Sequence, residues 1–430
     1  HTATDKMTLK FNSTTKPVAV GMVREFKEFT YQANDVEAGG TVFEIDSKDA
    51  LIEFASKVAD GSFATSYTAA AVVADIDMTG YDWTPIEGFG AYEFDGGSED
   101  GYAIKGLNAP LFGTTAATIQ NLKLTDVAIT FEKPAGSKGS LVCVMDGGSI
   151  NNCEVAGTLS VSNPTDVYGY GGVVGIVTGA ATISHVVNRC TVSVDISNNK
   201  EVAIGGVLGK ATQPLNITYC DNYGTLTLAG EDADVVRIGG ILGYISAGGT
   251  TAEYLNNHAV LTINPKTSGG VHFGGVFGSV LAKSSIKNSY NKQGANLNVY
   301  GVPGAVSIGG IAGYGSSVFD IDTCENSGNI AFSYESTGQT MIGGIYGYNN
   351  TSSANTIKNV TNHGSITVEG SNTHHIRTGG VIGYSYTNTT LEGLTNNGAI
   401  NVSASSKAAF CGGVIAYAEA NTGTNIINNG

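Results

Sequence analysis

The sequence predicts an all-β protein: a right-handed parallel β-helix of about nine three-strand coils behind an N-terminal helical cap. Three observations support this prediction. A Gly-Gly pair recurs at nearly constant spacing from Gly171 to Gly413. Each repeat contains short runs of alternating polar and β-branched residues, which are typical of strands. No repeat contains a run with the periodicity of a helix.

Each repeat unit begins with a Gly-Gly pair followed by two apolar residues. The pairs start at Gly171, Gly205, Gly239, Gly274, Gly309, Gly343, Gly379 and Gly412, and a degenerate copy lies near Gly139. Successive pairs are 33 to 36 residues apart. A fixed period of this length indicates a solenoid, in which each unit packs against its neighbours.

Three strand-like parts follow one another in each unit. In one unit they are Ile342–Tyr348, Thr356–Val360 and Ser365–Val368. One strand for each part gives one coil, and parallel coils stack at about 4.8 Å. We expect the helix to be right-handed, because parallel crossovers within one sheet nearly always are.

Two columns of residues recur in register and predict the interior and a turn. The β-branched column is expected to form the core: Val173, Val207, Ile241, Val276, Ile311, Ile345, Val381 and Val414. Its flanking glycines would allow close approach of the backbone. The second column is Asn222, Asn257, Asn291, Asn326, Asn362, Asn396 and Asn428. Asn tolerates a left-handed turn, and stacked amides bond from coil to coil, so we predict a structural ladder, with a ligand-binding strip as the alternative.

The cysteines are predicted to be free thiols. The chain contains Cys143, Cys153, Cys190, Cys220, Cys324 and Cys411, and none forms a CxxC pair. Cys153 and Cys220 share a column two coils apart, about 9.6 Å. A disulfide needs Cα atoms within about 7 Å.

The N-terminal third differs from the repeats. Residues 1–45 form an N-terminal β segment with alternating runs at 6–11 and 28–32, either a small sheet or the remnant of a preceding domain. Residues 46–136 are expected to form the helical cap and lead-in coils, and residues 137–430 the repeats. The helix is predicted at 46–60, capped by Asp46 or Ser47 and ended by Gly61, because its apolar residues follow helical spacing. It would cover the open first coil.

Composition excludes several classes of protein. The chain has 430 residues and a formal net charge of −15, so nucleic acid is not expected as a partner. No apolar run approaches the length of a transmembrane helix. The chain begins at His1, and we interpret it as a trimmed or mature form. No cofactor motif or metal-binding spacing is present, so we expect neither.

A catalytic β-helix would need carboxylates close together, or acidic Ca²⁺ ligands beside a basic residue. Asp221 and Glu325 share a column but lie three coils apart, about 14 Å. Another column mixes residue types and is interpreted as an exposed position without function: Ala203, Arg237, His272, Ser307, Met341 and Arg377.

Three smaller acidic or histidine motifs have structural interpretations. Asp75 and Asp77 alternate on a strand and are expected to serve a turn rather than a metal. Glu231, Asp232 and Asp234 form an acidic loop, taken as solvated, with weak Ca²⁺ binding as the alternative. The adjacent pair His374 and His375 would point to opposite faces of a strand, which argues against joint ligation.

The tetrads Gly206-Val-Leu-Gly209, Gly240-Ile-Leu-Gly243 and Gly380-Val-Ile-Gly383 resemble the GLUG-type repeats of bacterial surface proteins, many of them from gut Bacteroidetes. The stretch Ala74–Ile86, with Phe94-Asp-Gly96 and Gly106–Gly113, is similar to the lead-in of such proteins. The resemblance covers about residues 46–430. The turn at 97–100 and Ala416, in place of a tetrad glycine, depart from it. It implies a right-handed β-helix at the cell surface and a role in adhesion, with no catalytic residues to transfer.

One column stands out as a candidate binding surface. Tyr244, Tyr314, Tyr348, Tyr384 and Tyr417 follow the tetrads, whereas other coils carry Ile176, Lys210 and Ser279 there. The column is either an aromatic ladder that stabilises the sheet or an exposed strip that binds a glycan or protein. We therefore predict a non-catalytic adhesion or binding protein, extracellular or at the cell surface, with outer-membrane anchoring of a precursor as one arrangement. Its partner would be a glycan or a surface protein of a host or neighbouring cell. The alternatives are a polysaccharide lyase or glycosidase and a passive spacer.

Overall fold

A computed structural model describes residues 41–430, apart from 98–100, 166–167, 197–200, 268, 302–303, 337 and 387. The runs expected at 6–11 and 28–32, and all but the first residue of the turn at 97–100, lie outside the described residues. So do the side chains of Glu231 and Asp232.

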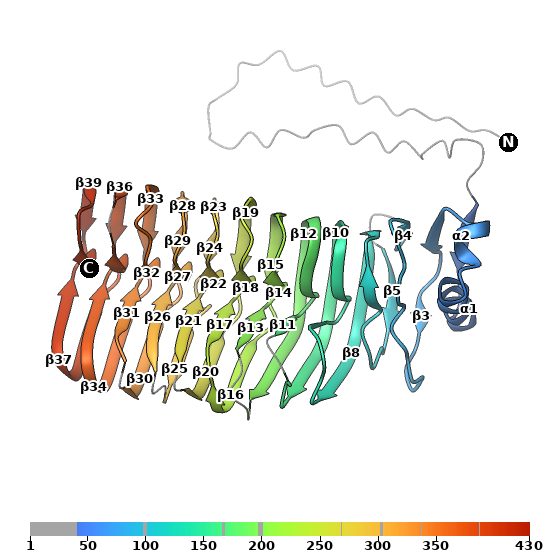
Figure 1. Ribbon diagram of the computed structural model, residues 1–430, viewed down its shortest axis with the longest axis horizontal. Helices are drawn as coiled ribbons and strands as arrows, with labels where there is room; N and C mark the ends of the chain where they lie inside the picture. Colours follow the sequence, from blue (N-terminus) through green and yellow to red (C-terminus); the bar gives the residue numbers. More distant parts are fainter. Residues whose placement is uncertain are drawn as a thin grey trace, which may run out of the picture. The chain divides into compact units, whose positions relative to one another are not determined.

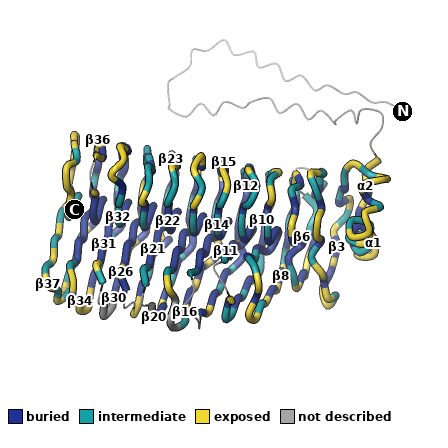
Figure 2. The backbone as a smooth tube through the Cα atoms, viewed as in Figure 1, coloured by how far each residue is buried: buried dark blue, intermediate teal, exposed yellow. Residues whose placement is uncertain are grey.

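The described chain from Thr41 onward is a parallel β-solenoid of about nine turns, which confirms the predicted fold class. Each strand pairs in parallel with its counterpart in the next coil, and the coils follow one another along the axis in sequence order (Figure 1). The buried residues form one continuous cluster through the stack (Figure 2). Neither helix of the described residues has the length and apolar character needed to cross a membrane.

A complete coil contains four strand segments. The first ends at the Gly pair: β9 (Lys138–Gly139), β11 (Tyr168–Gly171), β13 (Val202–Gly205), β17 (Val236–Gly239), β21 (Gly270–Gly274), β26 (Ala305–Gly309), β31 (Thr340–Gly343) and the ends of β34 (Ile366–Gly379) and β37 (Ile400–Gly412). The second follows the pair: β6 (Phe112–Thr115), the starts of β10 (Val142–Ser162) and β12 (Val174–Ile196), β14 (Leu208–Ala211), β18 (Leu242–Ile245), β22 (Phe277–Val280), β27 (Ala312–Gly315), β32 (Tyr346–Asn349), β35 (Ile382–Ser385) and β38 (Ile415–Ala418).

The third segment ends at the asparagine column: β7 (Thr118–Gln120), the middle of β10 and β12, β15 (Leu215–Asn222), β19 (Thr250–Asn257), β23 (Ser284–Lys287) with β24 (Tyr290–Asn291), β28 (Phe319–Asp322) with β29 (Glu325–Asn326), β33 (Asn355–Asn362), β36 (Thr389–Asn396) and β39 (Thr422–Asn428). The fourth comprises β8 (Leu122–Glu132), the ends of β10 and β12, β16 (Leu226–Ala233), β20 (Leu261–Thr267), β25 (Leu297–Tyr300), β30 (Ile330–Ser336) and the starts of β34 and β37. In the lead-in, β1 (Val42–Ile45), β2 (Ala69–Val72) and β4 (Glu93–Asp95) precede β7, while β3 (Ile76–Asp77) and β5 (Tyr102–Lys105) precede β8.

The Gly pair divides the first predicted part of each unit into two short strands. The predicted core column is buried throughout. A Cβ on Gly240 would lie 2.5 Å from Cγ of Asn257 and against the carbonyl oxygen of Gly275 in the next coil. The glycines are therefore required for close packing, as predicted.

The asparagine column forms a buried amide ladder that runs from coil to coil. Nδ2 of Asn222 donates to Oδ1 of Asn257 at 2.9 Å, and Nδ2 of Asn257 donates to Oδ1 of Asn291 at 2.8 Å. The same bond joins the remaining predicted members, and Asn188 extends the ladder by one coil. We call these residues the ladder asparagines, and they confirm the predicted structural ladder.

The predicted left-handed conformation of the ladder asparagines is wrong. The left-handed residues lie three positions earlier in each coil, in what we call the turn column: Asn152, His185, Tyr219, Tyr254, Asn288, Thr323, Asn359, Gly393 and Asn425. Each ladder asparagine lies at the end of an extended strand, because its side chain must point inward to bond the asparagines of neighbouring coils. The left-handed bend therefore lies before the asparagine and not at it.

The predicted helix is confirmed as α1 (Lys48–Ala59), and Oγ of Ser47 caps it by accepting from the backbone N–H of Ala50. A short helix, α2 (Phe63–Ser66), follows. Both lie at the N-terminal end of the stack (Figure 1). Phe54 of α1 packs 5.2 Å from the ring of Phe89 and 5.6 Å from that of Phe94, so α1 covers the apolar end of the first coils.

All six cysteines are free, as predicted, and only Cys411 is exposed. Burial raises the pKa of Cys153, Cys220 and Cys324 to about 12, so these thiols stay protonated and unreactive. We expect iodoacetamide at neutral pH to modify Cys411 alone in the native protein and all six cysteines after unfolding without reductant. Fewer than six modified residues in the unfolded protein, counted by mass spectrometry, would contradict this assignment.

Candidate binding surface

The predicted tyrosine column is in register. Tyr314, Tyr348, Tyr384 and Tyr417 pair on consecutive coils, and Tyr244 lies two coils earlier with Ser279 between. The rings do not form a flat strip. Tyr348 and Tyr384 stack at 4.8 Å with their planes 6° apart, but Tyr314 meets Tyr348 edge-on and Tyr384 meets Tyr417 edge-on.

The hydroxyls of Tyr314, Tyr348 and Tyr384 are engaged by the protein itself. The Tyr348 hydroxyl donates to Oδ1 of Asn350 at 2.8 Å, and Nδ2 of Asn350 donates to the Tyr314 hydroxyl at 2.9 Å. The Tyr384 hydroxyl donates to Glu419 at 2.5 Å. Tyr384 is buried, Tyr244, Tyr314 and Tyr348 are half-buried, and Tyr417 is exposed.

The column of mixed residues that was expected to be exposed is instead packed against the tyrosines. Arg237 is 6% exposed and Arg377 is 8% exposed. The guanidinium of Arg237 lies 4.3 Å from the Tyr244 ring, and that of Arg377 lies 4.8 Å from the Tyr384 ring. The expected exposure of this column is wrong because the chain bends at each Gly pair and brings the strands before and after the pair together. As a result, side chains seven residues apart, such as those of Arg237 and Tyr244, come into contact.

His272 belongs to this packed column. Its ring stacks on Tyr314 at 4.1 Å, and its Nδ1 lies 2.5 Å from Oγ of Ser279. Burial, with a smaller contribution from the Arg237 charge, lowers the pKa of His272 to about 3, so the ring is neutral at ordinary pH. The two facing columns together form a cation–aromatic seam, which we call the outer seam.

The acidic motifs have local structural partners. Oδ1 of Asp75 accepts from the backbone N–H of Ala103, and Oδ1 of Asp77 accepts from that of Thr79, each at 2.9 Å. Asp221 and Glu325 are separated by Asn256 and Tyr290 in register, so they are three coils apart as predicted. Within the described part of the chain, no three His, Cys, Asp or Glu side chains gather in a way that could hold a metal ion.

A second aromatic surface, which the repeat pattern did not indicate, lies on the turn column. His185, Tyr219 and Tyr254 have φ of 52°, 53° and 56°. Left-handed backbone costs an L-residue roughly 1–2 kcal/mol, and Asn tolerates it better than an aromatic residue does. The same column carries Asn152 and Asn288 on the adjoining coils. Two tyrosines therefore occupy positions that favour Asn.

These three side chains stack on the outside of the solenoid. The His185 and Tyr219 rings are 4.8 Å apart with planes at 10°, and the Tyr219 and Tyr254 rings are 4.6 Å apart with planes at 14°. Tyr219 is 47% exposed and Tyr254 37% exposed. We call this row the first stack.

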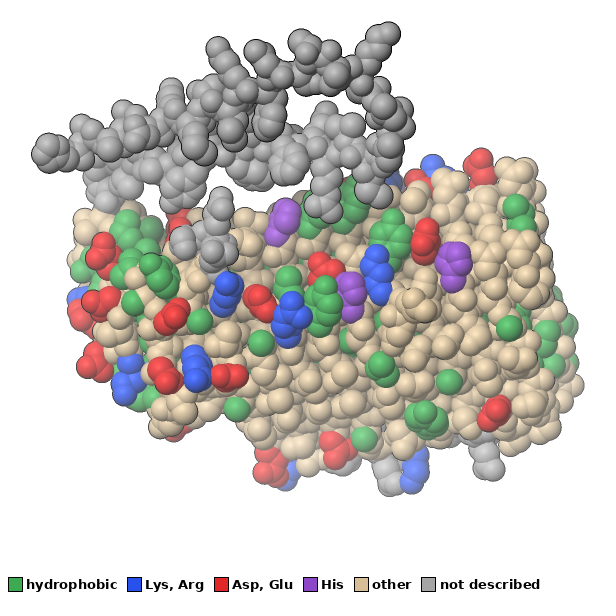
Figure 3. Space-filling model, turned by 180° about the vertical axis from the view of Figure 1, so that it is seen from behind, with side chains coloured by type: hydrophobic (Ala, Val, Ile, Leu, Met, Phe, Trp, Pro, Cys, Tyr) green, Lys and Arg blue, Asp and Glu red, His purple; other side chains and the backbone are tan. Residues whose placement is uncertain are grey.

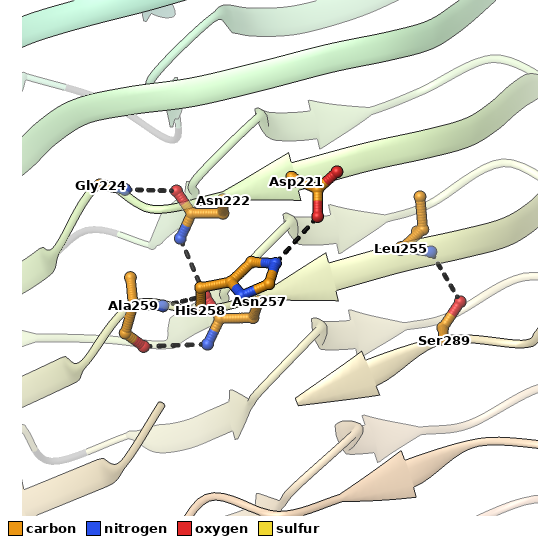
Figure 4. Close-up of polar contacts among 8 residues, drawn as sticks. All are labelled: Asp221, Asn222, Gly224, Leu255, Asn257, His258, Ala259 and Ser289. Carbon is orange, nitrogen blue, oxygen red and sulfur yellow. Dashed lines mark hydrogen bonds and ion pairs between the residues drawn. The ribbon is translucent and has the colours of Figure 1, made fainter. Parts of the chain in front are cut away.

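A second stack occupies the same three coils, one residue after each ladder asparagine. The guanidinium of Arg189 lies 4.5 Å from the Tyr223 ring, which stacks on His258 at 4.2 Å. Nε2 of His258 lies 2.9 Å from Oδ1 of Asp221 in the preceding coil, and Figure 4 shows the imidazole reaching across to that carboxylate beside the ladder. Arg189 likewise pairs with Glu154 of its preceding coil at 2.6 Å.

A column of half-buried residues runs between the two stacks: Val187, Asp221, Asn256 and Tyr290. We call it the median column, and the two stacks with it the double stack. Figure 3 shows a row of hydrophobic, basic, acidic and histidine side chains across one face whose surface is otherwise mostly of other types. The sequence signal that could have found the double stack is the replacement of Asn by Tyr three residues before a ladder asparagine.

The comparisons with known proteins do not assign a family. No family model matches the chain, and no curated protein matches it. A crystal structure from Bacteroides ovatus, of a protein provisionally named an immunoglobulin A1 protease, is similar at 18% identity and a TM-score of 0.42, over 68% of this chain and 78% of that one. A likeness of this extent contributes nothing to the assignment of a function here.

Proposed function

We propose that this chain is a non-catalytic binding protein of the extracellular space or cell surface, and that its contact surface is the double stack. The observation that carries the proposal is the exposed pair Tyr219 and Tyr254, held in left-handed backbone. The solenoid imposes this turn on every coil, so a residue other than Asn or Gly there keeps some strain. Strained residues concentrate at functional sites, and here the strained pair is also aromatic and exposed.

The hydroxyls distinguish the two tyrosine surfaces. Among the described residues, no hydrogen bond engages the hydroxyl of Tyr219, Tyr223 or Tyr254, whereas the outer seam engages those of Tyr348 and Tyr384 internally. Tyrosine suits a contact surface because it offers a rigid ring and a polar end at low entropic cost. This contrast favours the double stack as the contact surface and the outer seam as a stabilising element.

Replacement of Tyr219 and Tyr254 by Asn is expected to abolish binding while the fold persists, because Asn already occupies this turn on neighbouring coils. The experiment compares wild type and the Tyr219→Asn/Tyr254→Asn variant on arrays of glycans and extracellular-matrix proteins. Tyr300→Asn, which removes an exposed tyrosine of the fourth segment, is the matched control. Equal binding by wild type and the double variant would overturn the proposed surface. Turnover of a bound glycan would overturn its non-catalytic nature.

The outer seam is expected to respond in the opposite way. Tyr348→Ala/Tyr384→Ala removes two stacked rings and exposes Arg377, and should lower the free energy of unfolding by about 2–4 kcal/mol. Binding by the remaining folded protein should be unchanged. Denaturant titration followed by circular dichroism measures the first effect, and the same arrays measure the second. A stable variant that no longer binds would make the outer seam the contact surface instead.

A further inference from the structure

We infer that the double stack binds a short, uncharged oligosaccharide that lies along the axis of the solenoid. The inference rests on the proposed function and adds to it the class of ligand and the residues that contact it. It follows from the direction of the stacks, from their polar groups, from their charge and from their size.

The stacks set the direction of the ligand. Their rings follow one another along the axis, at 4.8 Å and 4.6 Å in the first stack. The first stack ends at Tyr254, because the next coil has Asn288 in this column. No other aromatic ring of the described residues stacks on the remaining face of Tyr254. A sugar ring has a C–H face that packs on an aromatic face such as this one. The next sugar units of the ligand would then extend along the axis, over the outward edges of the stacked rings.

The median column supplies hydrogen bonds along the same line. Asp221 uses Oδ1 to hold His258, and its Oδ2 has no hydrogen-bond partner among the described residues. Oδ1 of Asn256, on the next coil, is buried and has no partner in the described part of the chain. A buried acceptor without a donor costs about 1–3 kcal/mol. The Asn256 side chain is half-buried, so a rotation of its amide would bring Oδ1 to the surface, where a sugar hydroxyl could donate to it. The three free tyrosine hydroxyls stand on either side of this column.

The charges of the double stack are already compensated within the protein. Arg189 pairs with Glu154, and His258 faces Asp221. The ammonium of Lys292 lies 4.0 Å over the Tyr290 ring at the end of the median column. Among the described residues no basic cluster is left here to select an acidic ligand, and the chain carries a net charge of −15. An uncharged ligand, rich in hydroxyls, fits these groups best.

The size of the surface favours an oligosaccharide over a protein. Along the axis the double stack covers three coils, or about 10 Å. Across the axis its two stacks lie four residues apart along each strand, or roughly 13 Å. The resulting area, on the order of 100–150 Å², is well below the roughly 800 Å² that each partner buries in a stable protein complex.

The test measures binding by isothermal titration calorimetry with cellotriose, mannotriose and lacto-N-neotetraose as uncharged probes. Trigalacturonate serves as the charged probe, and enzymatically deglycosylated fibronectin and laminin as protein probes. We expect at least one uncharged probe to bind, and Asn256→Ala or Tyr254→Asn to weaken it about tenfold or more. Thr361→Ala, in the same column three coils further on, is the matched control and should leave affinity unchanged. Circular dichroism establishes that each variant is folded.

Each contrary outcome overturns a defined part of the account. Binding of trigalacturonate alone refutes the uncharged ligand, and uncharged binding unaffected by Asn256→Ala refutes the assigned contacts. Binding of deglycosylated protein alone, lost in Tyr219→Asn/Tyr254→Asn, refutes the saccharide and leaves the proposed function intact. Absence of binding to every probe by the wild type refutes both proposals.

Discussion

Replacement of Asn257 by Leu is expected to lower the free energy of unfolding by about 4 kcal/mol, because it interrupts the buried amide ladder at its middle. The side chain of Asn257 takes part in four hydrogen bonds. It accepts from Asn222 and from the backbone N–H of Ala259, and it donates to Asn291 and to the carbonyl of Ala259. A leucine side chain has similar volume but leaves Nδ2 of Asn222 and Oδ1 of Asn291 buried without these partners.

The effect of this substitution can be measured by urea unfolding, with Asn264→Leu as the control. Asn264 is exposed on the fourth segment, so its replacement should change stability by no more than about 0.5 kcal/mol. Hydrogen exchange should show that the loss of protection is greatest in β15, β19 and β24, because each coil of a solenoid contacts its immediate neighbours. An Asn257→Leu variant as stable as wild type would show that the ladder does not stabilise the stack.

Replacement of Gly240 by Ala is expected to prevent the central coils from packing. The added Cβ would overlap the carbonyl oxygen of Gly275 and would approach Cγ of Asn257 to 2.5 Å. Both atoms belong to elements fixed by the stack, and overpacking of this kind costs at least about 1–3 kcal/mol, more where backbone must move. We expect most of the protein to be insoluble, with a much reduced melting temperature in the soluble remainder.

Gly248→Ala is the control for this effect. Gly248 lies eight residues further on, its Cβ would meet nothing closer than the carbonyl oxygen of Lys283 at 3.6 Å, and the variant should behave as wild type. A soluble Gly240→Ala protein with an unchanged melting temperature would contradict the close-packing role of the second glycine.

The fold could be predicted because its causes are local and repeated. A residue such as Ile241 lies in the core of its coil for the same reason as Val276 in the next, so one period of the pattern specifies the whole stack. The free cysteines followed from the same register. The ladder was predicted correctly, but the left-handed turn lies at Tyr254 and not at Asn257. The preference of Asn for left-handed turns suggested Asn257, whose side chain instead points inward to bond Asn291.

The surface could not be predicted in the same way. The residue pattern places no constraint on Arg237, because its partner Tyr244 lies across the bend at the Gly pair and the sequence does not give the angle of that bend. The double stack depends on which side chains of neighbouring coils lean together, as His258 does over Asp221. Such contacts join residues that lie about one repeat apart in the chain. The other repeats carry different residues at the same positions, so no recurring pattern reveals the contact.

The proposed role of the double stack requires that Tyr219 and Tyr254 are retained for binding and not for stability. The most direct test is the free energy of unfolding of the Tyr219→Asn/Tyr254→Asn variant, which requires no knowledge of the ligand. Loss of the ring contacts costs roughly 0.5–1.5 kcal/mol for each pair, and the lower cost of left-handed backbone for Asn than for Tyr returns a similar amount. We therefore predict a stability within about 1 kcal/mol of wild type, measured by urea unfolding. A loss of about 3 kcal/mol or more would show that the stacked rings hold the solenoid together, and would contradict their assignment to a binding surface.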